Sequence, residues 1–241
     1  MKNGLKEMQY KFIGKSLYFP EKEILLVADL HIGYEESLNE QGIFMPRRQF
    51  EETMADLEKV FEKIGEVKEV VILGDLKHEF GLISSQEWGE VRKVLDYLKS
   101  KTGKIVLIKG NHDTVLEPIA KREEVEIKEC YVKKDICFLH GDKLIAECMD
   151  KKIKMLVMGH RHPAVVLRDG YKKEKYKCFL VGKWKGKKII ILPSFFPFVE
   201  GSEISSIEDN RMFIPEKELK GFEAYVVGDE VYGFGKLKEI V

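Results

Sequence analysis

Short apolar runs alternate with amphipathic stretches in the first half of the chain. Residues 24–28, 70–73 and 105–108 are predicted to be buried strands, because each is a nearly continuous run of Val, Ile and Leu. Residues 47–64 and 85–99 are predicted to be helices, because their apolar positions recur every three or four residues. This order of elements is typical of a parallel sheet with helices on it. Residues 8–19 are predicted as one edge strand, and the stretch around Gly42 and Pro46 as irregular.

The second half of the chain is richer in strands. Strands are predicted at 136–139 and 155–158, with a helix over 143–151 between them and a short helical piece near 116–121. Three more strands, joined by turns at Gly170 and Gly186, follow between 163 and 192, and residues 222–234 are predicted to form a hairpin. Since neither an internal repeat nor a linker divides the chain, we expect one domain, residues 1–241, with two sheets packed face to face and helices outside.

Composition narrows the class of protein. A chain of 241 residues can bury a full α/β core. Its 41 basic and 41 acidic residues cancel, so it lacks the overall positive charge that would hold nucleic acid non-specifically. No apolar run approaches the roughly 18 residues of a membrane span, and there is no signal-peptide pattern, so we expect a cytoplasmic protein without a membrane partner. Four cysteines without close pairing predict buried free thiols. The sequence does not indicate an oligomeric state.

Polar residues with metal-binding chemistry follow the predicted strands. Each histidine of the chain comes just after a predicted buried strand, in a short loop with Asp, Asn or Gly beside it. Because the carboxyl ends of the strands of an α/β sheet share one edge, these loops are predicted to converge. The residues brought together would be Asp29, His31, Asp75, Asn111, His112, His140, His160 and His162.

The residue types in this predicted cluster indicate which metals would fit. Imidazoles, carboxylates and one carboxamide without a thiolate favour Mn²⁺, Fe or Zn²⁺ over a structural cysteine zinc site. Seven or so candidate ligands are too many for one tetrahedral ion. They suit two ions roughly 3.5–4 Å apart that share a carboxylate, as in metal-assisted phosphoester hydrolysis.

The motifs resemble those of the calcineurin-like metallophosphoesterase superfamily. Five blocks match in order: Asp29-Leu30-His31, Gly74-Asp75, Gly110-Asn111-His112-Asp113, His140-Gly141-Asp142 and Gly159-His160-Arg161-His162. Residues 22–200 further resemble the archaeal relatives of the DNA ligase-associated phosphoesterases, through Ala28–Glu35, Gly74–Phe80, Gly159–Pro163 and Ile191–Phe195. That branch often has asparagine after this phenylalanine, whereas this chain has Phe196.

The resemblance implies a four-layer α/β/β/α sandwich and a dinuclear metal centre. It assigns Asp29, His31, Asp75 and His162 to one ion, and Asp75, Asn111, His140 and His160 to the other. Mn²⁺ is expected, with Fe, Zn²⁺, Ni²⁺ and Mg²⁺ as alternatives. A metal-bound hydroxide would attack the phosphorus, while His112 stabilises or protonates the leaving oxygen and Asp113 orients its ring. We expect a phosphodiesterase; a phosphomonoesterase, a cyclic-nucleotide hydrolase, a nuclease and a non-catalytic protein-binding scaffold are the alternatives.

Two residues and one segment outside this ligand set are candidates for substrate contact. His78 either reaches toward the substrate phosphate or orders its own loop, and Arg161 either binds a second phosphate or holds Asp142. Between Arg168 and Lys188, nine basic residues stand against two acids, with Tyr171, Tyr176 and Trp184 interleaved. This segment is predicted either to contact nucleic acid or to form a solvated hairpin.

Overall fold

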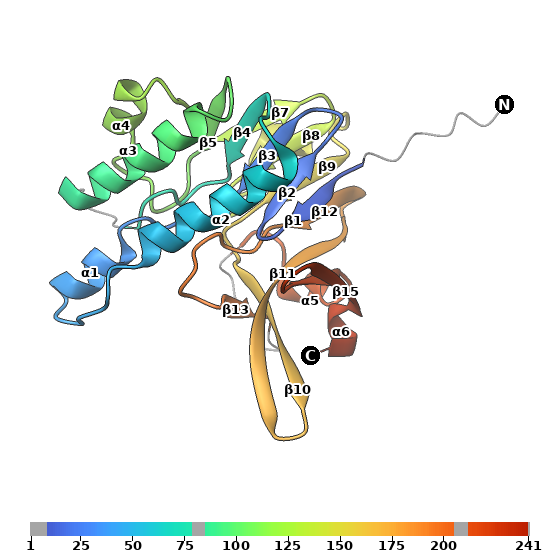
Figure 1. Ribbon diagram of the computed structural model, residues 1–241. Helices are drawn as coiled ribbons and strands as arrows, with labels where there is room; N and C mark the ends of the chain where they lie inside the picture. The colour runs from blue at the N-terminus through green and yellow to red at the C-terminus, as the bar shows by residue number, and fades with distance from the viewer. Residues whose placement is uncertain (1–8, 79–84, 205–211, 241) are drawn as a thin grey trace.

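In the computed structural model, which describes residues 9–78, 85–204 and 212–240, the strands form two sheets (Figure 1). The first sheet has the order β1-β2-β3-β4-β5-β6. The members of this sheet are β1 Lys11–Ile13, β2 Ser16–Phe19, β3 Ile24–Val27, β4 Glu69–Ile72, β5 Ile105–Ile108 and β6 Glu126–Lys128. Strands β3 to β6 run parallel, so the loops that follow them emerge at the same edge.

The second sheet is mixed and has the order β13-β10-β11-β12-β9-β8-β7, with β14 and β15 paired beyond β11. Its strands are β7 Cys130–Lys133, β8 Ile136–Leu139, β9 Met155–Met158, β10 Pro163–Asp169, β11 Lys172–Trp184, β12 Lys187–Ile191, β13 Ser202–Glu203, β14 Glu223–Val227 and β15 Val231–Lys236. Strands β8, β9 and β12 are parallel to one another. The loops after β8 and β9 therefore also share an edge.

The apolar strands form the inner two of four layers. In β3, Ile24 and Leu26 belong to the core between the sheets, together with Phe179 of β11. Leu25 and Val27 point the opposite way and belong to the core under the helices. Helices α1 Tyr34–Glu40, α2 Gln49–Ile64, α3 Ser85–Lys99 and α4 Glu117–Arg122 accompany the first sheet, whereas the 3₁₀ helix Ala146–Met149, α5 Glu216–Leu219 and α6 Leu237–Ile240 accompany the second. This arrangement confirms the predicted α/β/β/α architecture.

Three local predictions are wrong. Residues 8–19 contain two strands, because Gly14, with φ of 54°, turns the chain back. Helix α1 lies in the stretch predicted to be irregular, and its seven mostly polar residues show no apolar period. The helix predicted over 143–151 is only the 3₁₀ turn Ala146–Met149, because the backbone is still extended at Ile145. In the part of the chain that the structure describes, every helix is too short or too polar to cross a membrane.

A disulfide joins Cys137 on β8 to Cys148 in the 3₁₀ helix, which corrects the prediction of four free thiols. Cys130 is half-buried and Cys178 buried, and both are free thiols. The bonded cysteines lie 11 residues apart, and the packing of the 3₁₀ helix on the sheet brings them together. The spacing of the cysteines in the sequence therefore could not predict this disulfide.

We expect Cys148→Ser to lower the free energy of unfolding by about 2–4 kcal/mol, because it removes a covalent constraint on the unfolded chain. Chemical denaturation without reductant measures the free energy of unfolding of both proteins. The difference between wild type and variant should shrink once the wild-type disulfide is reduced. As a control, Cys178→Ser should change the denatured-state thiol count without affecting the disulfide. Unreduced, denatured wild-type protein that titrates with four thiols instead of two would contradict the pairing.

Candidate metal centre

Two clusters that each combine one carboxylate with two imidazoles lie at the edge where the parallel strands end, and a third group that shares His31 contains only the imidazoles of His31, His78 and His112. Within each cluster, the potential ligand atoms are all within 4.8 Å of one another. The first contains Asp29, His31 and His162, and the second contains Asp75, His140 and His160. The loops after β3, β4, β8 and β9 therefore bring together six of the seven ligands predicted from the sequence.

Asp75, a member of the second cluster, also faces the first. Its Oδ2 atom is 3.8 Å from Nε2 of His31 in the first cluster and 3.4 Å from Nε2 of His140 in the second. The seventh predicted ligand, Asn111, is also present, with Oδ1 3.0 Å from Nε2 of His140. One carboxylate thus faces both groups, which is the arrangement that two neighbouring cations require.

The backbone at the candidate ligands is unusual. Left-handed φ angles occur at Asp29 (54°), His31 (47°), Asp75 (47°), His160 (64°) and His162 (47°). Non-glycine residues rarely adopt this conformation, which costs on the order of 1–3 kcal/mol each and is found mainly at functional sites. The conformation turns the chain sharply at the strand end.

Two glycines allow the neighbouring loops to approach the carboxylates. A Cβ atom at Gly110 would collide with the carboxylate and backbone nitrogen of Asp75, and one at Gly159 would collide with the carboxylate of Asp29. The glycines of the Gly110-Asn111 and Gly159-His160 motifs therefore have a packing reason to be there.

The charges of the cluster favour a cation. Burial opposes protonation of His140, yet the carboxylates of Asp75 and Asp29 outweigh it and raise the pKa of His140 to about 10. Burial lowers the pKa of His31 to about 3, so this imidazole is neutral and offers a lone pair. Oδ1 of Asp29 is buried and, among the described residues, has no hydrogen-bond partner. The donor set therefore fits divalent cations, which would displace the proton of His140.

His112 lies beside the cluster, with its ring centre 4.9 Å from that of His31. Its backbone N–H donates to Oδ1 of Asp75 at 2.9 Å, and its ring Nδ1 lies 2.5 Å from the carbonyl oxygen of His78. His78 is half-buried, and its ring centre is 5.2 Å from that of His112. The carbonyl of His78 is thus the group that orients the His112 ring.

Asp113 does not have the position predicted for it. Its carboxylate oxygens accept hydrogen bonds from the backbone N–H groups of Leu76, at 3.1 Å, and Gly110, at 2.9 Å. Asp113 therefore ties the loop after β5 to the loop after β4. Its contribution is to hold Asp75 and Asn111 in place, and the prediction that it orients the ring of His112 is corrected accordingly.

Arg161 is turned away from the cluster. Its guanidinium, only 2% exposed, donates to the carboxylate of Glu216 on α5 and, at 3.3 Å, to the carbonyl of Glu203. The prediction that Arg161 binds a second phosphate is therefore wrong, and its ion-pair partner is Glu216 instead of Asp142. This contact fastens the loop that carries His160 and His162 to the outer layer.

We expect Arg161→Met to lower the free energy of unfolding by about 3–5 kcal/mol, because it leaves the charge of Glu216 buried without its partner. Urea denaturation measures the change. The double variant Arg161→Met/Glu216→Met should recover most of the loss, since both charges are then absent. A double variant less stable than the single one would argue against an ion-pair origin of the effect.

Several positioning residues were missed by the sequence reasoning. Gln49, at the start of α2, donates to the carbonyls of Leu30 and His31 and so fixes the first ligand loop. Lys15 and Lys177 donate to carbonyl oxygens of Phe195 and Ser194, at 2.8 and 2.9 Å respectively. These lysines have no motif around them; only the folded chain shows that they are turned inward.

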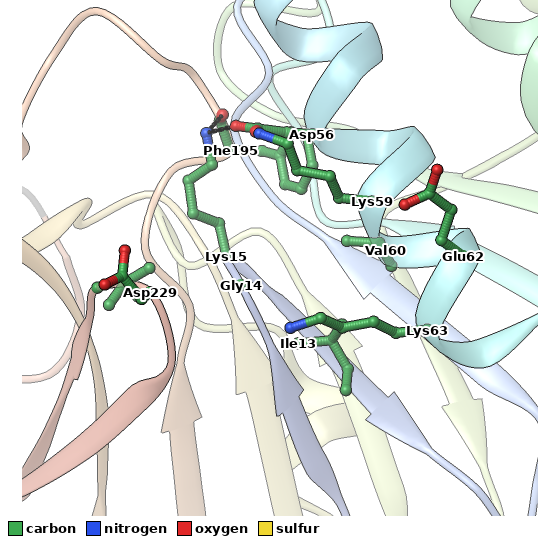
Figure 2. A pocket seen from close by; sticks show the side chains of 12 residues that line it. Ile13, Gly14, Lys15, Asp56, Lys59, Val60, Glu62, Lys63, Phe195 and Asp229 are labelled. Atoms are coloured by element: carbon green, nitrogen blue, oxygen red, sulfur yellow. Dashed lines mark hydrogen bonds and ion pairs between the residues drawn. The ribbon is translucent and has the colours of Figure 1, made fainter.

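The loop held by these lysines borders the metal centre. Its backbone N–H groups at Phe195 and Phe196 donate to the carbonyls of Ala28 and Asp29, and the Phe196 ring centre lies 6.0 Å from that of His31. Figure 2 shows the ammonium of Lys15 bonded to both the Asp56 carboxylate and the Phe195 carbonyl. These residues line a pocket of about 450 Å³ beside α2. This pocket contains none of the histidines, so it is separate from the metal centre.

An α/β/β/α sandwich with histidines and carboxylates clustered at its strand ends has the architecture of a metal-dependent hydrolase. The family model of the calcineurin-like phosphoesterases matches residues 22–180. The chain therefore belongs to the calcineurin-like phosphoesterase family, whose members use divalent metals. The predicted superfamily is confirmed, whereas the archaeal branch stays a prediction.

The solved structures that match this chain have low sequence identity to it, and the first of the following three shares its fold. The nuclease MPE of Pseudomonas putida is 24% identical with a TM-score of 0.65, over 91% of this chain and 92% of that chain. A protein of unknown function from Aquifex aeolicus, AQ665, is 18% identical with a TM-score of 0.38, over 58% of this chain and 78% of that chain. A Vps29 mutant from Entamoeba histolytica is 15% identical with a TM-score of 0.38, over 88% of this chain and 99% of that chain. A search of curated protein sequences returned no match.

Proposed function

We propose that this chain is a dinuclear-metal-dependent phosphodiesterase. The observation that carries the proposal is the grouping of all seven candidate ligands at one edge, with Asp75 facing both clusters and His112 beside them. Two such ion sites next to a proton donor are the arrangement used in two-metal phosphoester hydrolysis. A non-catalytic scaffold would need neither.

In this proposal, Asp75 belongs to both ion sites. Asp29, His31 and His162 complete the first site; Asn111, His140 and His160 complete the second. Imidazole and carboxylate ligands suit Mn²⁺, which we propose as the native metal, and Fe, Zn²⁺, Ni²⁺ and Mg²⁺ remain the alternatives. When bound, the two ions supply an activated water nucleophile and positive charge for the phosphoryl oxygens.

The residues of this chain supply the proton and the orientation. Since Nδ1 of His112 donates to the carbonyl of His78, its ring is held with Nε2 as the nitrogen for the leaving oxygen. In this role His112 protonates the departing group. His78 orders the loop through the same carbonyl, and its backbone N–H donates to Glu87 at 3.1 Å, so we propose a positioning role for it.

For the substrate we favour a phosphodiester of nucleic acid or a nucleotide. The support is the shared fold with a protein described as a nuclease and the basic residues that follow the His160-Arg161-His162 loop. A phosphomonoesterase uses the same metal centre and is the second candidate. The choice between the two depends on loops around the centre.

Hydrolysis of bis-(p-nitrophenyl) phosphate and of p-nitrophenyl phosphate with Mn²⁺, Mg²⁺, Zn²⁺ or Ni²⁺ tests the proposal. We expect faster hydrolysis of the diester, greatest with Mn²⁺ and abolished by a chelator. A strong preference for the monoester would overturn the diesterase assignment. An absence of metal-dependent hydrolysis with both compounds would overturn the proposal that this chain is an enzyme.

A further inference from the structure

The outer parts of strands β10 and β11 form a hairpin arm that projects beyond the rest of the second sheet (Figure 1). The arm, residues 163–177, begins directly after His162, one of the candidate ligands. Its outer part is exposed, and Tyr171 at the tip is fully so. A projecting structure that starts at the metal centre is well placed to contact a substrate that extends beyond the centre.

The charges of the arm are divided between its two faces. Residues paired across an antiparallel ladder point to the same face, and successive pairs alternate. Arg168 pairs with Lys173, and Lys175 pairs with Val166, so these three cations share one face. The opposite face carries Asp169, Lys172, Glu174 and Tyr176.

The opposite face is internally neutralised. The Lys172 ammonium lies 2.6 Å from the Glu174 carboxylate, which also accepts a hydrogen bond from Tyr176. Leu167, Tyr176 and Val165 on that face belong to the outer core of the second sheet or pack against it. The acids of the arm are therefore confined to this side, and the cations available to a ligand lie on the other.

The cationic face leads to the metal centre. Lys177 lies on the same face, two positions beyond Lys175, and its Nζ holds the carbonyl of Ser194. The next residues of that loop bond to Ala28 and Asp29 and place Phe196 beside His31. On β11, this face continues into Phe179 and Val181 of the core between the sheets. The row of cations thus ends at the rim of the ligand cluster.

The remaining basic residues of the 168–188 segment lie elsewhere. Lys187 is buried, with Nζ on the carbonyls of Asp150 and Ile153, and Lys185 covers the ring of Trp184. They lie at the far end of the 13-residue strand β11, about 40 Å from the tip at the usual rise per residue. The basic segment read from the sequence is therefore two separate groups, and only the arm adjoins the metal centre.

A groove of about 630 Å³ runs along the arm, and its lining includes Arg168, Lys173 and Lys175, together with Glu174 and Tyr176 from the neighbouring positions of β11. Glu200 and Glu203 also line this groove, near its base. Cations in a row with an exposed aromatic ring nearby are the combination that holds single-stranded nucleic acid, through phosphates and base stacking respectively. The carboxylates at the base would oppose this binding.

We propose that the Arg168, Lys173 and Lys175 face of the arm binds the phosphates of a single-stranded nucleic acid, with Tyr171 as a stacking surface at the tip. This inference deepens the proposed phosphodiesterase function, on which it rests, since the bound strand would continue past Lys177 to the metal centre. The arm would raise the affinity for a nucleic-acid polymer, and it would leave the chemistry at the metal centre unchanged.

Fluorescence anisotropy with a labelled single-stranded DNA of about 20 nucleotides tests the arm, with phosphorothioate linkages to prevent cleavage. We expect Lys173→Glu/Lys175→Glu to raise Kd by about tenfold or more and to reduce the salt slope of log K by about 1.4, for two lost phosphate contacts. Lys183→Glu/Lys185→Glu, which changes two exposed lysines at the far end of β11, is the matched control and should bind like wild type. Glu200→Gln should lower Kd, because it removes an opposing charge.

The same variants are assayed with bis-(p-nitrophenyl) phosphate, which is too small to reach the arm, and all should hydrolyse it at the wild-type rate. Unchanged DNA binding in Lys173→Glu/Lys175→Glu, or an equal loss in Lys183→Glu/Lys185→Glu, would overturn the arm as a binding surface. Wild-type protein that binds DNA through the arm but hydrolyses neither nitrophenyl ester would overturn the proposed function and leave this surface standing.

Discussion

His112→Ala is expected to abolish turnover while both metal ions stay bound. His112 is outside the two clusters that contain a carboxylate; its ring groups instead with those of His31 and His78, and its Nδ1 is held by the carbonyl of His78. Loss of a general acid reduces kcat by roughly 10²–10⁴-fold. The measurements are kcat with bis-(p-nitrophenyl) phosphate and metal content by mass spectrometry after dialysis.

Asn111→Ala is the contrasting variant for this prediction. Asn111 precedes His112 in the same turn, but its Oδ1 faces His140 in the second cluster. It should therefore lower metal affinity, and added metal should restore part of its activity. If His112→Ala were the variant that lost metal, the division of roles between these neighbours would be wrong.

Asp75→Asn should have the second large effect, the loss of both ions. Its carboxylate lies between His31 and His140, and it is the main source of the raised pKa of His140. Without that negative charge, neither cluster would retain a divalent cation against dialysis. Isothermal titration with Mn²⁺ should show binding too weak to fit, and hydrolysis should fall to the background rate.

Asp142→Asn is the matched control for the Asp75 variant. Asp142 is a half-buried carboxylate two residues beyond His140, and it is not in either cluster. Removing its charge should leave metal stoichiometry at the wild-type value. Retention of two ions by Asp75→Asn would mean that Asp75 is not shared, and the assignment of ligands to two sites would have to be redrawn.

The strands and the convergence of their loops could be predicted from the sequence because both depend on local patterns. A continuous run such as Ile24–Val27 can only be a buried strand or a buried helix, and four residues are too few for the helix. The parallel order then fixes which ends meet. The positions of Asp29, Asp75 and His140 follow from that rule.

The features that were not predicted depend on contacts between distant residues. Lys15 and Lys177 have the appearance of surface lysines until the loop of residues 193–196 folds over them. Asp113 adjoins His112 in sequence, but its carboxylate is taken by backbone N–H groups of two loops. The alternation of charge along the arm is present in the sequence. Which charges share a face could not be predicted from it, because that depends on the pairing of Arg168 with Lys173 across the two strands.

The left-handed backbone at five candidate ligands implies a trade-off between the thermal stability of the metal-free protein and its activity. Glycine adopts this conformation readily, so His162→Gly would relieve strain in the backbone of its loop. We therefore expect the metal-free protein to melt at a higher temperature with such a substitution, as it loses its capacity to bind ions. Selection for thermal stability alone would therefore replace these ligands. Bound cations can stabilise the strained loops, because they bind to the folded protein and not to the unfolded chain.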